Sequence, residues 1–134
     1  RINDGMPEFV ASQIIKSIIS SNINVKGSKI LVLGITFKEN CPDIRNTKVL
    51  NLVNELEDYG CEIDVADPQA DHQEVLSNYR IKLLPNNIEY NFSKYDFIIY
   101  AVDHIEFNML KFSESDKNKI YDITSTLSNP KYSL

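Results

Sequence analysis

Short runs of apolar residues constrain the fold of this chain more than any other feature. The segments 29–34 and 96–102 are almost wholly apolar after their first residue and are no longer than a strand. An unbroken apolar run of this length is typical of a strand buried on both faces of a parallel sheet. Further strands are predicted at 61–66, 81–84 and 119–123.

Segments with helical periodicity separate these strands. Residues 4–21 repeat apolar side chains at steps of three and four, and a second helix carries apolar residues between 49 and 56. A short polar helix is predicted at 69–79 and a helical turn at 105–110. Strands that alternate with helices at this spacing predict right-handed βαβ units. The expected fold is therefore an α/β, Rossmann-like doubly wound sheet of about five mainly parallel strands, with helices on both faces.

The composition limits the class of partner. The 134 residues suit one domain, and a net charge of −5 without a basic block argues against a dedicated nucleic-acid binder. No apolar run approaches the roughly 20 residues of a membrane span. Cys41 and Cys61 lack the spacing of a metal site and indicate a reduced, cytoplasmic protein. Because the chain starts at Arg1 and not at methionine, we expect it to be part of a longer protein.

Ligands of doubly wound sheets bind beyond the carboxyl ends of the strands, so the loop at 34–47 is the first candidate site. Of the G-x-G-x-x-G turn that a dinucleotide requires, only Gly34 is present, and no NAD site is assigned here. Lys38, Arg45 and the start of the second helix instead suit a small anion, and Phe37 suits a flat base or sugar. The alternative is that these charges are solvated and pair within the loop.

Three other residues have a chemical interpretation and a simpler structural one. Asp67 could accept hydrogen bonds from ribose hydroxyls, but without a glycine-rich turn we expect an Asp-Pro turn that closes the strand. His104 could act as an acid or a base, yet no nucleophile accompanies it in the sequence, so we expect an exposed loop histidine. Cys41 has both cations and acids nearby, and we expect an unreactive thiol.

The loop also carries a family pattern. Its string from 34 to 49, GITFKENCPDIRNTKV, resembles the signature G-x-[TAS]-[FY]-K-x-x-x-x-D-x-R of the UDP-glucose/GDP-mannose dehydrogenase family. This signature opens the family's C-terminal domain. Residues 59–68 resemble the family's second strand, which ends in Asp-Pro, and the strands predicted at 96–102 and 119–123 are similar to its later strands. The sequence around Cys41 most resembles that of the subgroup that makes UDP-N-acetylhexosaminuronic acids for capsule, Vi-type and O-antigen polysaccharides. The resemblance implies that residues 1–25 link from a central domain and that 26–134 form the C-terminal nucleotide-sugar-binding domain.

The reaction implied by the resemblance is a pair of NAD-dependent oxidations, which convert the C6 hydroxyl of a UDP-sugar into a carboxylate through intermediates on a cysteine. In the family, NAD binds an N-terminal domain, and the nucleophilic cysteine lies at the end of the central region. Both would precede Arg1, so no catalytic residue, cofactor or metal is expected in this chain, which alone should be inactive. The implied partners are a UDP-sugar, with UDP-N-acetylhexosamine favoured, the two other domains, and further copies in a homodimer or larger assembly. Neither nucleic acid nor membrane is expected.

The same resemblance implies roles for five loop residues. Phe37 and Lys38 would face the nucleotide sugar, and Lys38 would supply a cation for the diphosphate. Gly34, Asp43 and Arg45 would organise the loop. In this interpretation Asp43 and Arg45 pair with each other, and Arg45 helps the second helix present its N-terminus.

The residues also set limits on this interpretation. Many relatives carry an arginine just after the last strand that reaches the substrate, whereas residues 123–129 contain none. A regulatory receiver domain would need paired acids after the first strand and a lysine after the last, and the sequence has neither. A non-catalytic α/β interaction domain without a ligand would keep the same loop for structural reasons, and this alternative stays open.

Overall fold

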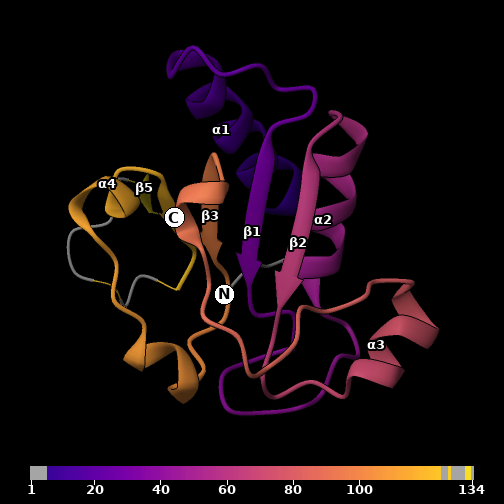
Figure 1. Ribbon diagram of the computed structural model, residues 1–134. Helices are drawn as coiled ribbons and strands as arrows, with labels where there is room; N and C mark the ends of the chain where they lie inside the picture. The colour runs from indigo at the N-terminus through magenta and orange to yellow at the C-terminus, as the bar shows by residue number, and fades with distance from the viewer. Residues whose placement is uncertain (1–5, 125–126, 128–131, 134) are drawn as a thin grey trace.

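A parallel sheet of five strands lies at the centre of the computed structural model, which describes residues 6–124, 127, 132 and 133 (Figure 1). The strands are β1 (Lys29–Leu33), β2 (Glu62–Ala66), β3 (Phe97–Tyr100), β4 (Ile120–Asp122) and β5 (Tyr132–Ser133). They lie in the order β2-β1-β3-β4-β5, and every neighbouring pair is parallel. The predicted α/β doubly wound sheet is confirmed.

The surroundings of β1 explain why polar and apolar residues do not alternate along this strand. Ile30 and Val32 pack into the core on one face of the sheet, and Leu31 and Leu33 pack into the core on the other. All four side chains are fully buried. Because β1 has a strand on each edge and a core on each face, none of these positions can hold a polar side chain without burying it.

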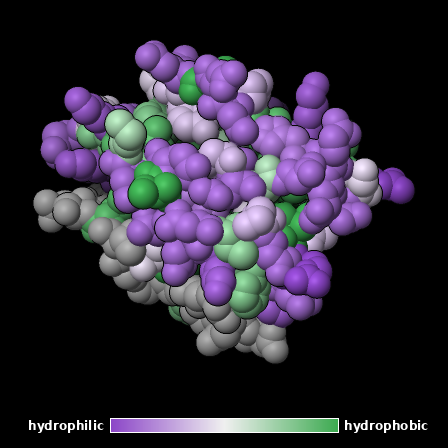
Figure 2. Space-filling model, turned by 90° about the horizontal axis from the view of Figure 1, so that it is seen from below, coloured by the Kyte–Doolittle hydropathy of each residue, from purple (hydrophilic) through white to green (hydrophobic). Residues whose placement is uncertain are grey.

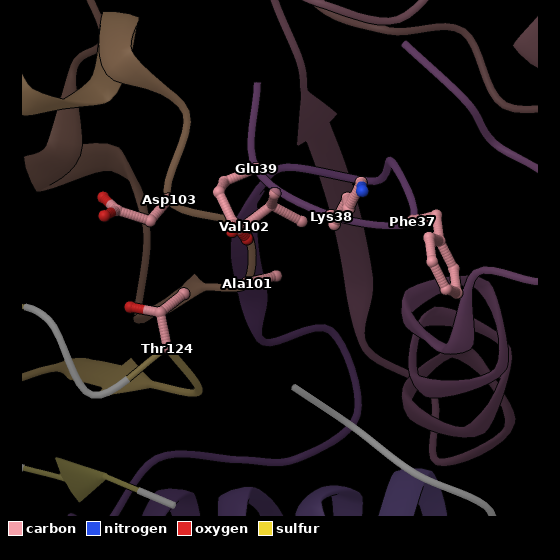
Figure 3. Close-up of a pocket in the computed structure, with 7 residues that line it drawn as sticks. All are labelled: Phe37, Lys38, Glu39, Ala101, Val102, Asp103 and Thr124. Atoms are coloured by element: carbon pink, nitrogen blue, oxygen red, sulfur yellow. The ribbon is translucent and has the colours of Figure 1, made fainter. Parts of the chain in front are cut away.

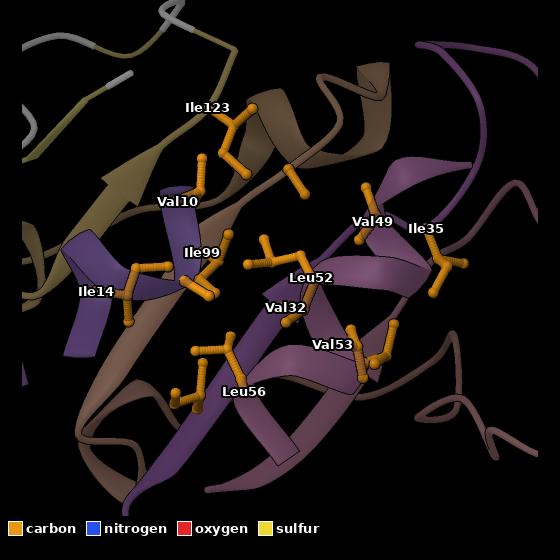
Figure 4. Packing of buried hydrophobic residues seen from close by; sticks show 14 of the residues in the cluster. Val10, Ile14, Val32, Ile35, Val49, Leu52, Val53, Leu56, Ile99 and Ile123 are labelled. Atoms are coloured by element: carbon orange, nitrogen blue, oxygen red, sulfur yellow. The ribbon is translucent and has the colours of Figure 1, made fainter. Parts of the chain in front are cut away.

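Two long helices cover one face of the sheet. Helices α1 (Met6–Ser20) and α2 (Lys48–Asp58) contact each other and share one core with the strands (Figure 4). In this core Ile14 of α1 and Leu56 of α2 are fully buried. The helix that the sequence assigned to a link between domains therefore packs in the core of the sheet. The domain boundary between residues 25 and 26 stays a prediction.

Short elements cover the second face. These are the 3-10 helices η1 (Phe92–Lys94) and η2 (Ile105–Met109), with helix α4 (Glu114–Lys117) following in the chain. Phe107 of η2 is buried there, and its ring centroid lies 5.9 Å from that of Tyr100 on β3. Large aromatic side chains thus fill the volume that a long helix would occupy in a longer connection.

The strand predicted at 81–84 is absent, and this prediction was wrong. After helix α3 (His72–Tyr79) the chain passes β2, where the Leu84 N–H donates to the Val65 carbonyl at 2.9 Å. Pro85 follows and has no N–H to continue the pairing, so one hydrogen bond does not extend into a ladder. Conversely, β5 lies in the last ten residues, where no periodicity predicted a strand.

Candidate functional site

The candidate site lies where the order of the sheet changes direction. The chain leaves β1 for β2 on one edge and later returns to β3 on the opposite edge of β1, so the loops after β1 and β3 diverge. A cleft of about 280 Å³ opens there, at the carboxyl ends of the strands. Its walls are formed by Phe37, Lys38, Glu39, Ala101, Val102, Asp103 and Thr124 (Figure 3).

Gly34 brings the two main walls of the cleft together. Its φ of +99° is strained for any residue with a side chain, and its N–H donates to the Ala66 carbonyl at 2.8 Å. An added Cβ would lie 2.6 Å from the Cβ of Val102, on the wall that follows β3. The close approach of the loops after β1 and β3 therefore requires glycine at this position.

The loop after β1 folds back on itself and contributes Phe37 and Lys38 to the wall of the cleft. The Phe37 N–H donates to the Asp43 carbonyl at 2.7 Å, and the Thr36 hydroxyl donates to the Lys38 carbonyl at 2.9 Å. In Figure 3 the ring of Phe37 lies on the side of the cleft away from Asp103. The structure therefore places both residues that the resemblance assigned to the ligand in the cleft wall.

Asp43 and Arg45 pair on the outer side of this loop. The guanidinium Nε and Nη2 donate to the two carboxylate oxygens at 3.0 and 2.9 Å, and the Arg45 backbone N–H adds a bond of 2.9 Å. These hydrogen bonds from Arg45 lower the pKa of Asp43 to about 2. Arg45 is 84% exposed and does not line the cleft, so the structure does not combine Arg45 with Lys38 in one anion site.

Asp67 is a buried carboxylate at the end of β2, with an exposed fraction of 1%. Its oxygens accept hydrogen bonds from the backbone N–H groups of Ile35, Thr36, Gln69 and Ala70. Burial raises the pKa of Asp67, but the hydrogen bonds from His104 and from these N–H groups outweigh burial and hold the pKa below its usual range. The predicted turn after Asp67 is present, and the same carboxylate also fixes the start of the loop after β1.

His104 is fully buried, and the expectation of an exposed loop histidine was wrong. Its Nδ1 accepts a hydrogen bond from the Asn40 backbone N–H at 3.0 Å, so this nitrogen carries no proton. Its Nε2 lies 2.9 Å from an Asp67 oxygen and 3.1 Å from the Thr36 hydroxyl oxygen, and these two acceptors share its single proton. The ring is therefore neutral, with one nitrogen accepting and the other donating.

The burial of His104 depends on segments that are distant in the sequence. The loop after β1 and the turn after β2 both bond to the ring, and the ring of Phe107 lies 5.6 Å from it between centroids. A polar residue just beyond a strand is ordinarily exposed, because loops run over the surface. The one local signal was the apolar character of Val102 and Phe107 on either side of the histidine.

The wall opposite Phe37 carries acceptors at the carboxyl ends of β3 and β4, where the sequence predicted a ligand site but assigned these acceptors no role. The Tyr100 hydroxyl donates to Asp103 at 2.8 Å and so orients this carboxylate. Thr124 is held by the buried Asp122, which accepts bonds from its backbone N–H at 2.8 Å and from its hydroxyl at 2.6 Å. With Glu39, the cleft lining holds two carboxylates beside the Lys38 ammonium. The surface at this end of the molecule is mainly hydrophilic (Figure 2).

The two cysteines lie outside the cleft lining. Cys41 is half-buried, and Cys61 is buried and accepts a hydrogen bond from the Ser28 hydroxyl at 3.3 Å. Burial raises the pKa of the Cys61 thiol. Within the part of the chain that the structure describes, no group of three histidine, cysteine or acidic side chains is arranged to hold a metal ion. None of the helices described in this way has the length and apolar character needed to cross a membrane.

The segment expected to hold a substrate arginine lies only partly within the described residues. Residues 123, 124 and 127 are described, and the rest of 123–129 lies outside them. None of these three described residues is a cation. Among the described residues that line the cleft, Lys38 is the only cation.

Comparison with protein families gives a match over most of the chain. The model described as the UDP-glucose/GDP-mannose dehydrogenase family, UDP binding domain, matches residues 31–129. The match includes every residue that lines the cleft.

Similar full-length proteins are considerably longer than this chain. A UDP-N-acetyl-D-glucosamine 6-dehydrogenase of Salmonella typhi is 44% identical over 132 residues, which cover 95% of this chain and 30% of that protein. A protein of the same description from Pseudomonas aeruginosa is 38% identical over 140 residues, which cover 100% of this chain and 32% of that protein. The chain thus spans less than a third of the length of either relative.

Solved structures share the fold. A UDP-D-ManNAc dehydrogenase from Pyrococcus horikoshii superposes with a TM-score of 0.72 at 24% identity, over 96% of this chain and 29% of that one. A UDP-glucose dehydrogenase from Pyrobaculum islandicum gives a TM-score of 0.69 at 16% identity, over 94% of this chain and 28% of that one. At these identities the likeness concerns the fold alone, and it agrees with the predicted Rossmann-like sheet.

Proposed function

The chain belongs to the UDP-glucose/GDP-mannose dehydrogenase family, and on that premise we propose that it is the UDP-sugar-binding domain of an NAD-dependent nucleotide-sugar 6-dehydrogenase. The whole enzyme would oxidise the C6 hydroxyl of its substrate to a carboxylate for polysaccharide biosynthesis. Because the chain spans less than a third of the length of these relatives, this activity is proposed for the whole protein and not for the chain alone. The chain alone is expected to bind and not to oxidise.

The observation that carries the proposal is the position of Phe37 and Lys38 side by side in a cleft at the switch point of the sheet. The Lys38 ammonium can neutralise part of a diphosphate, and the Phe37 ring offers a flat apolar surface to a base or sugar. The carboxylate of Asp103 suits the hydroxyl groups of a ribose or hexose, because it only accepts hydrogen bonds. These groups match a nucleotide sugar.

Gly34, Asp43 and Arg45 are proposed to organise the loop and not to touch the ligand. The positive φ of Gly34 directs the loop towards the wall after β3, and the ion pair of Asp43 with Arg45 braces its outer side. This ion pair is exposed, so its effect on global stability is expected to be small. We propose that the ion pair instead limits the conformations of the loop.

The proposed substrate is a UDP-N-acetylhexosamine, which the names of the two relatives above support. Oxidation of a primary hydroxyl to a carboxylate removes four electrons, which NAD would accept as successive hydride transfers. We place the NAD site and the nucleophilic cysteine in other domains, because the loop at 34–47 lacks a glycine-rich turn and neither cysteine lines the cleft. The whole protein is proposed to be a homodimer or larger and to work in the cytoplasm, where thiols such as Cys41 stay reduced.

Ligand titration of the isotope-labelled chain tests the proposal. Addition of a UDP-N-acetylhexosamine should shift the backbone amide signals of residues 34–47, and addition of NAD should leave them unchanged. The Lys38→Ala variant should weaken binding by about tenfold to a hundredfold, since a charged hydrogen bond to phosphate contributes about 1.5–3 kcal/mol. Larger shifts with NAD than with the UDP-sugar would contradict the assignment of this domain.

A matched control separates the site from a general effect of charge. Lys16 is an exposed lysine on α1, far from the cleft lining. Lys16→Ala removes the same charge from the molecule and should leave the affinity for the UDP-sugar unchanged. Equal losses in both variants would mean that only the net charge matters. A folded Lys38→Ala variant with full affinity would contradict the role of Lys38, and a wild-type chain that does not bind the UDP-sugar would favour an interaction domain without a ligand.

A further inference from the structure

His104 has an unexpected position relative to the cleft. The ring has no exposed surface and does not line the cleft. Its Nε2 nevertheless lies 3.1 Å from the Thr36 hydroxyl oxygen, and its Nδ1 accepts the Asn40 N–H at 3.0 Å. Thr36 and Asn40 directly flank the three consecutive cleft residues 37–39. One buried ring therefore holds both ends of the segment that forms one wall of the cleft.

Two further bonds extend this arrangement. The Thr36 hydroxyl donates onward to the Lys38 carbonyl at 2.9 Å, so the histidine is connected to the backbone of the cleft cation through one hydroxyl. The Asn40 side-chain oxygen accepts the Ile105 N–H at 2.8 Å, next to the histidine in the chain. Asp67 anchors the ring itself through Nε2, and Asp67 is fixed by backbone N–H groups of the loop after β1 and of its own turn after β2.

The arrangement requires one donor and one acceptor on the same side chain. A neutral imidazole with its proton on Nε2 supplies both, and the acceptor is Nδ1. A doubly protonated ring would carry a proton on Nδ1, which would face the Asn40 N–H. The other neutral tautomer would place a proton on Nδ1 in the same way, and it would also leave Nε2 without the proton that bonds to Asp67. No apolar side chain of similar size replaces these functions, although the side-chain amide of glutamine carries both an N–H donor group and a carbonyl acceptor.

We infer that His104 is a positioning residue of the nucleotide-sugar site, which clamps residues 36–40 so that Phe37 and Lys38 are held in the orientation that binds the ligand. The identity of the ligand in this inference rests on the proposed function. His104 acts through Thr36 and Asn40 and has no contact with the ligand. Without the clamp, the segment samples other conformations, and the measured affinity falls in proportion to the fraction of molecules in the binding orientation.

The clamp is tested first without ligand. Nitrogen-15 spectra of the wild-type chain should show an unprotonated Nδ1 and a protonated Nε2 for His104, and slow hydrogen exchange at the Asn40 amide. His104→Phe fills the space without hydrogen bonds, and the Asn40 amide should then exchange much faster. His104→Gln should keep the amide protected. A proton on Nδ1, or an Asn40 amide equally protected in the folded His104→Phe variant, would overturn the clamp.

Binding is tested next by titration with UDP. His104→Phe should weaken the affinity about tenfold or more, because a misplaced cation loses most of its bond to phosphate. His104→Gln should stay within about threefold of the wild type, a rescue that a loss of packing alone would not give. His72→Gln is the matched control at the other histidine, which lies on α3 away from the cleft, and should bind as the wild type does. If His104→Phe does not fold, Thr36→Val removes the relay to the Lys38 carbonyl with little change of shape.

The two proposals fail in different ways. A folded His104→Phe variant with wild-type affinity for UDP overturns the positioning role and leaves the proposed function intact. Equal losses in His104→Gln and His104→Phe, with the Asn40 amide protected only in the former, also overturn the positioning role. A wild-type chain in which UDP shifts none of the signals of residues 36–40 contradicts the proposed function, and the exchange of the Asn40 amide then still decides whether His104 is a clamp.

Discussion

At the scale of single residues, the cleft depends on positions that permit no ordinary substitute. Gly34 adopts a φ of +99° and leaves no space for a Cβ beside Val102. His104 supplies a donor and an acceptor from one buried ring. Polarity and size alone do not explain either requirement. Gly34 is needed for its backbone conformation, and His104 is needed because only one of its two nitrogens carries a proton.

Gly34→Ala should lower the free energy of unfolding by roughly 2–4 kcal/mol, since a positive φ costs about 1 kcal/mol and the overlap with Val102 adds the cost of an overpacked site. Chemical denaturation of the purified variant measures this loss. Gly27→Ala is the control, because Gly27 has a φ of +83° but its Cβ would meet no atom closer than 4.0 Å. A loss in Gly34→Ala no greater than that in Gly27→Ala would refute the close approach of the two loops.

At the scale of elements, helix α1 has a role that its sequence did not indicate. Its periodicity predicted an amphipathic helix, and the structure packs its apolar face against α2 and the sheet. Ile14 is fully buried in that core, whereas Ile19 on the same helix is 58% exposed. The second face of the sheet is covered by η1 and η2, and η2 corresponds to the helical turn predicted at 105–110.

Ile14→Ala should destabilise the chain by roughly 2–5 kcal/mol, the usual cost of removing a fully buried branched side chain and leaving a cavity. Ile19→Ala, on the exposed side of the same helix, should change stability by no more than about 0.5 kcal/mol. Thermal and denaturant unfolding of both variants provides the comparison. Equal, small effects would indicate that α1 is only a link between domains.

At the scale of the whole molecule, Asp67 joins the ends of three strands. Its carboxylate bonds to the loop after β1, to the turn after β2 and to His104 after β3. These strands are neighbours in the sheet but lie far apart in the sequence. Because the carboxylate is buried, each of its hydrogen bonds is worth more than it would be in water, and losing the charge affects all three loops together.

Asp67→Asn should lower the free energy of unfolding by roughly 2–4 kcal/mol at neutral pH, because an amide cannot accept all the bonds that the carboxylate accepts. The folded-state pKa of Asp67 lies below its unfolded value, so its stabilisation is present above the unfolded pKa of about 3.9 and is lost as the pH falls through the folded pKa. Denaturation at a series of pH values should therefore show a shallower acid decline in Asp67→Asn. Asp58→Asn, an exposed control on α2, should keep the wild-type decline.

Much of this molecule was determined locally by the sequence. The apolar runs predicted four of the five strands, and the helical periods predicted α1 and α2. A short polar helix was predicted where α3 lies, and the string around Lys38 indicated the family and the loop that forms the cleft. Such features depend on the period of side chains along one element and on motifs within one loop, which a single sequence contains. The pattern failed at 81–84, where a single bond to Val65 is followed by a proline that cannot pair.

Only the tertiary structure showed which residues are neighbours at the carboxyl ends of the strands. His104 was expected at the surface and is buried, because two loops remote in the sequence fold over its ring. Asp103 and Thr124 became part of the cleft only when β3 and β4 were placed next to β1. Burial and hydrogen-bond partners of such residues are properties of several segments at once, and no period along the chain encodes them, because they arise only when the sheet brings those segments together.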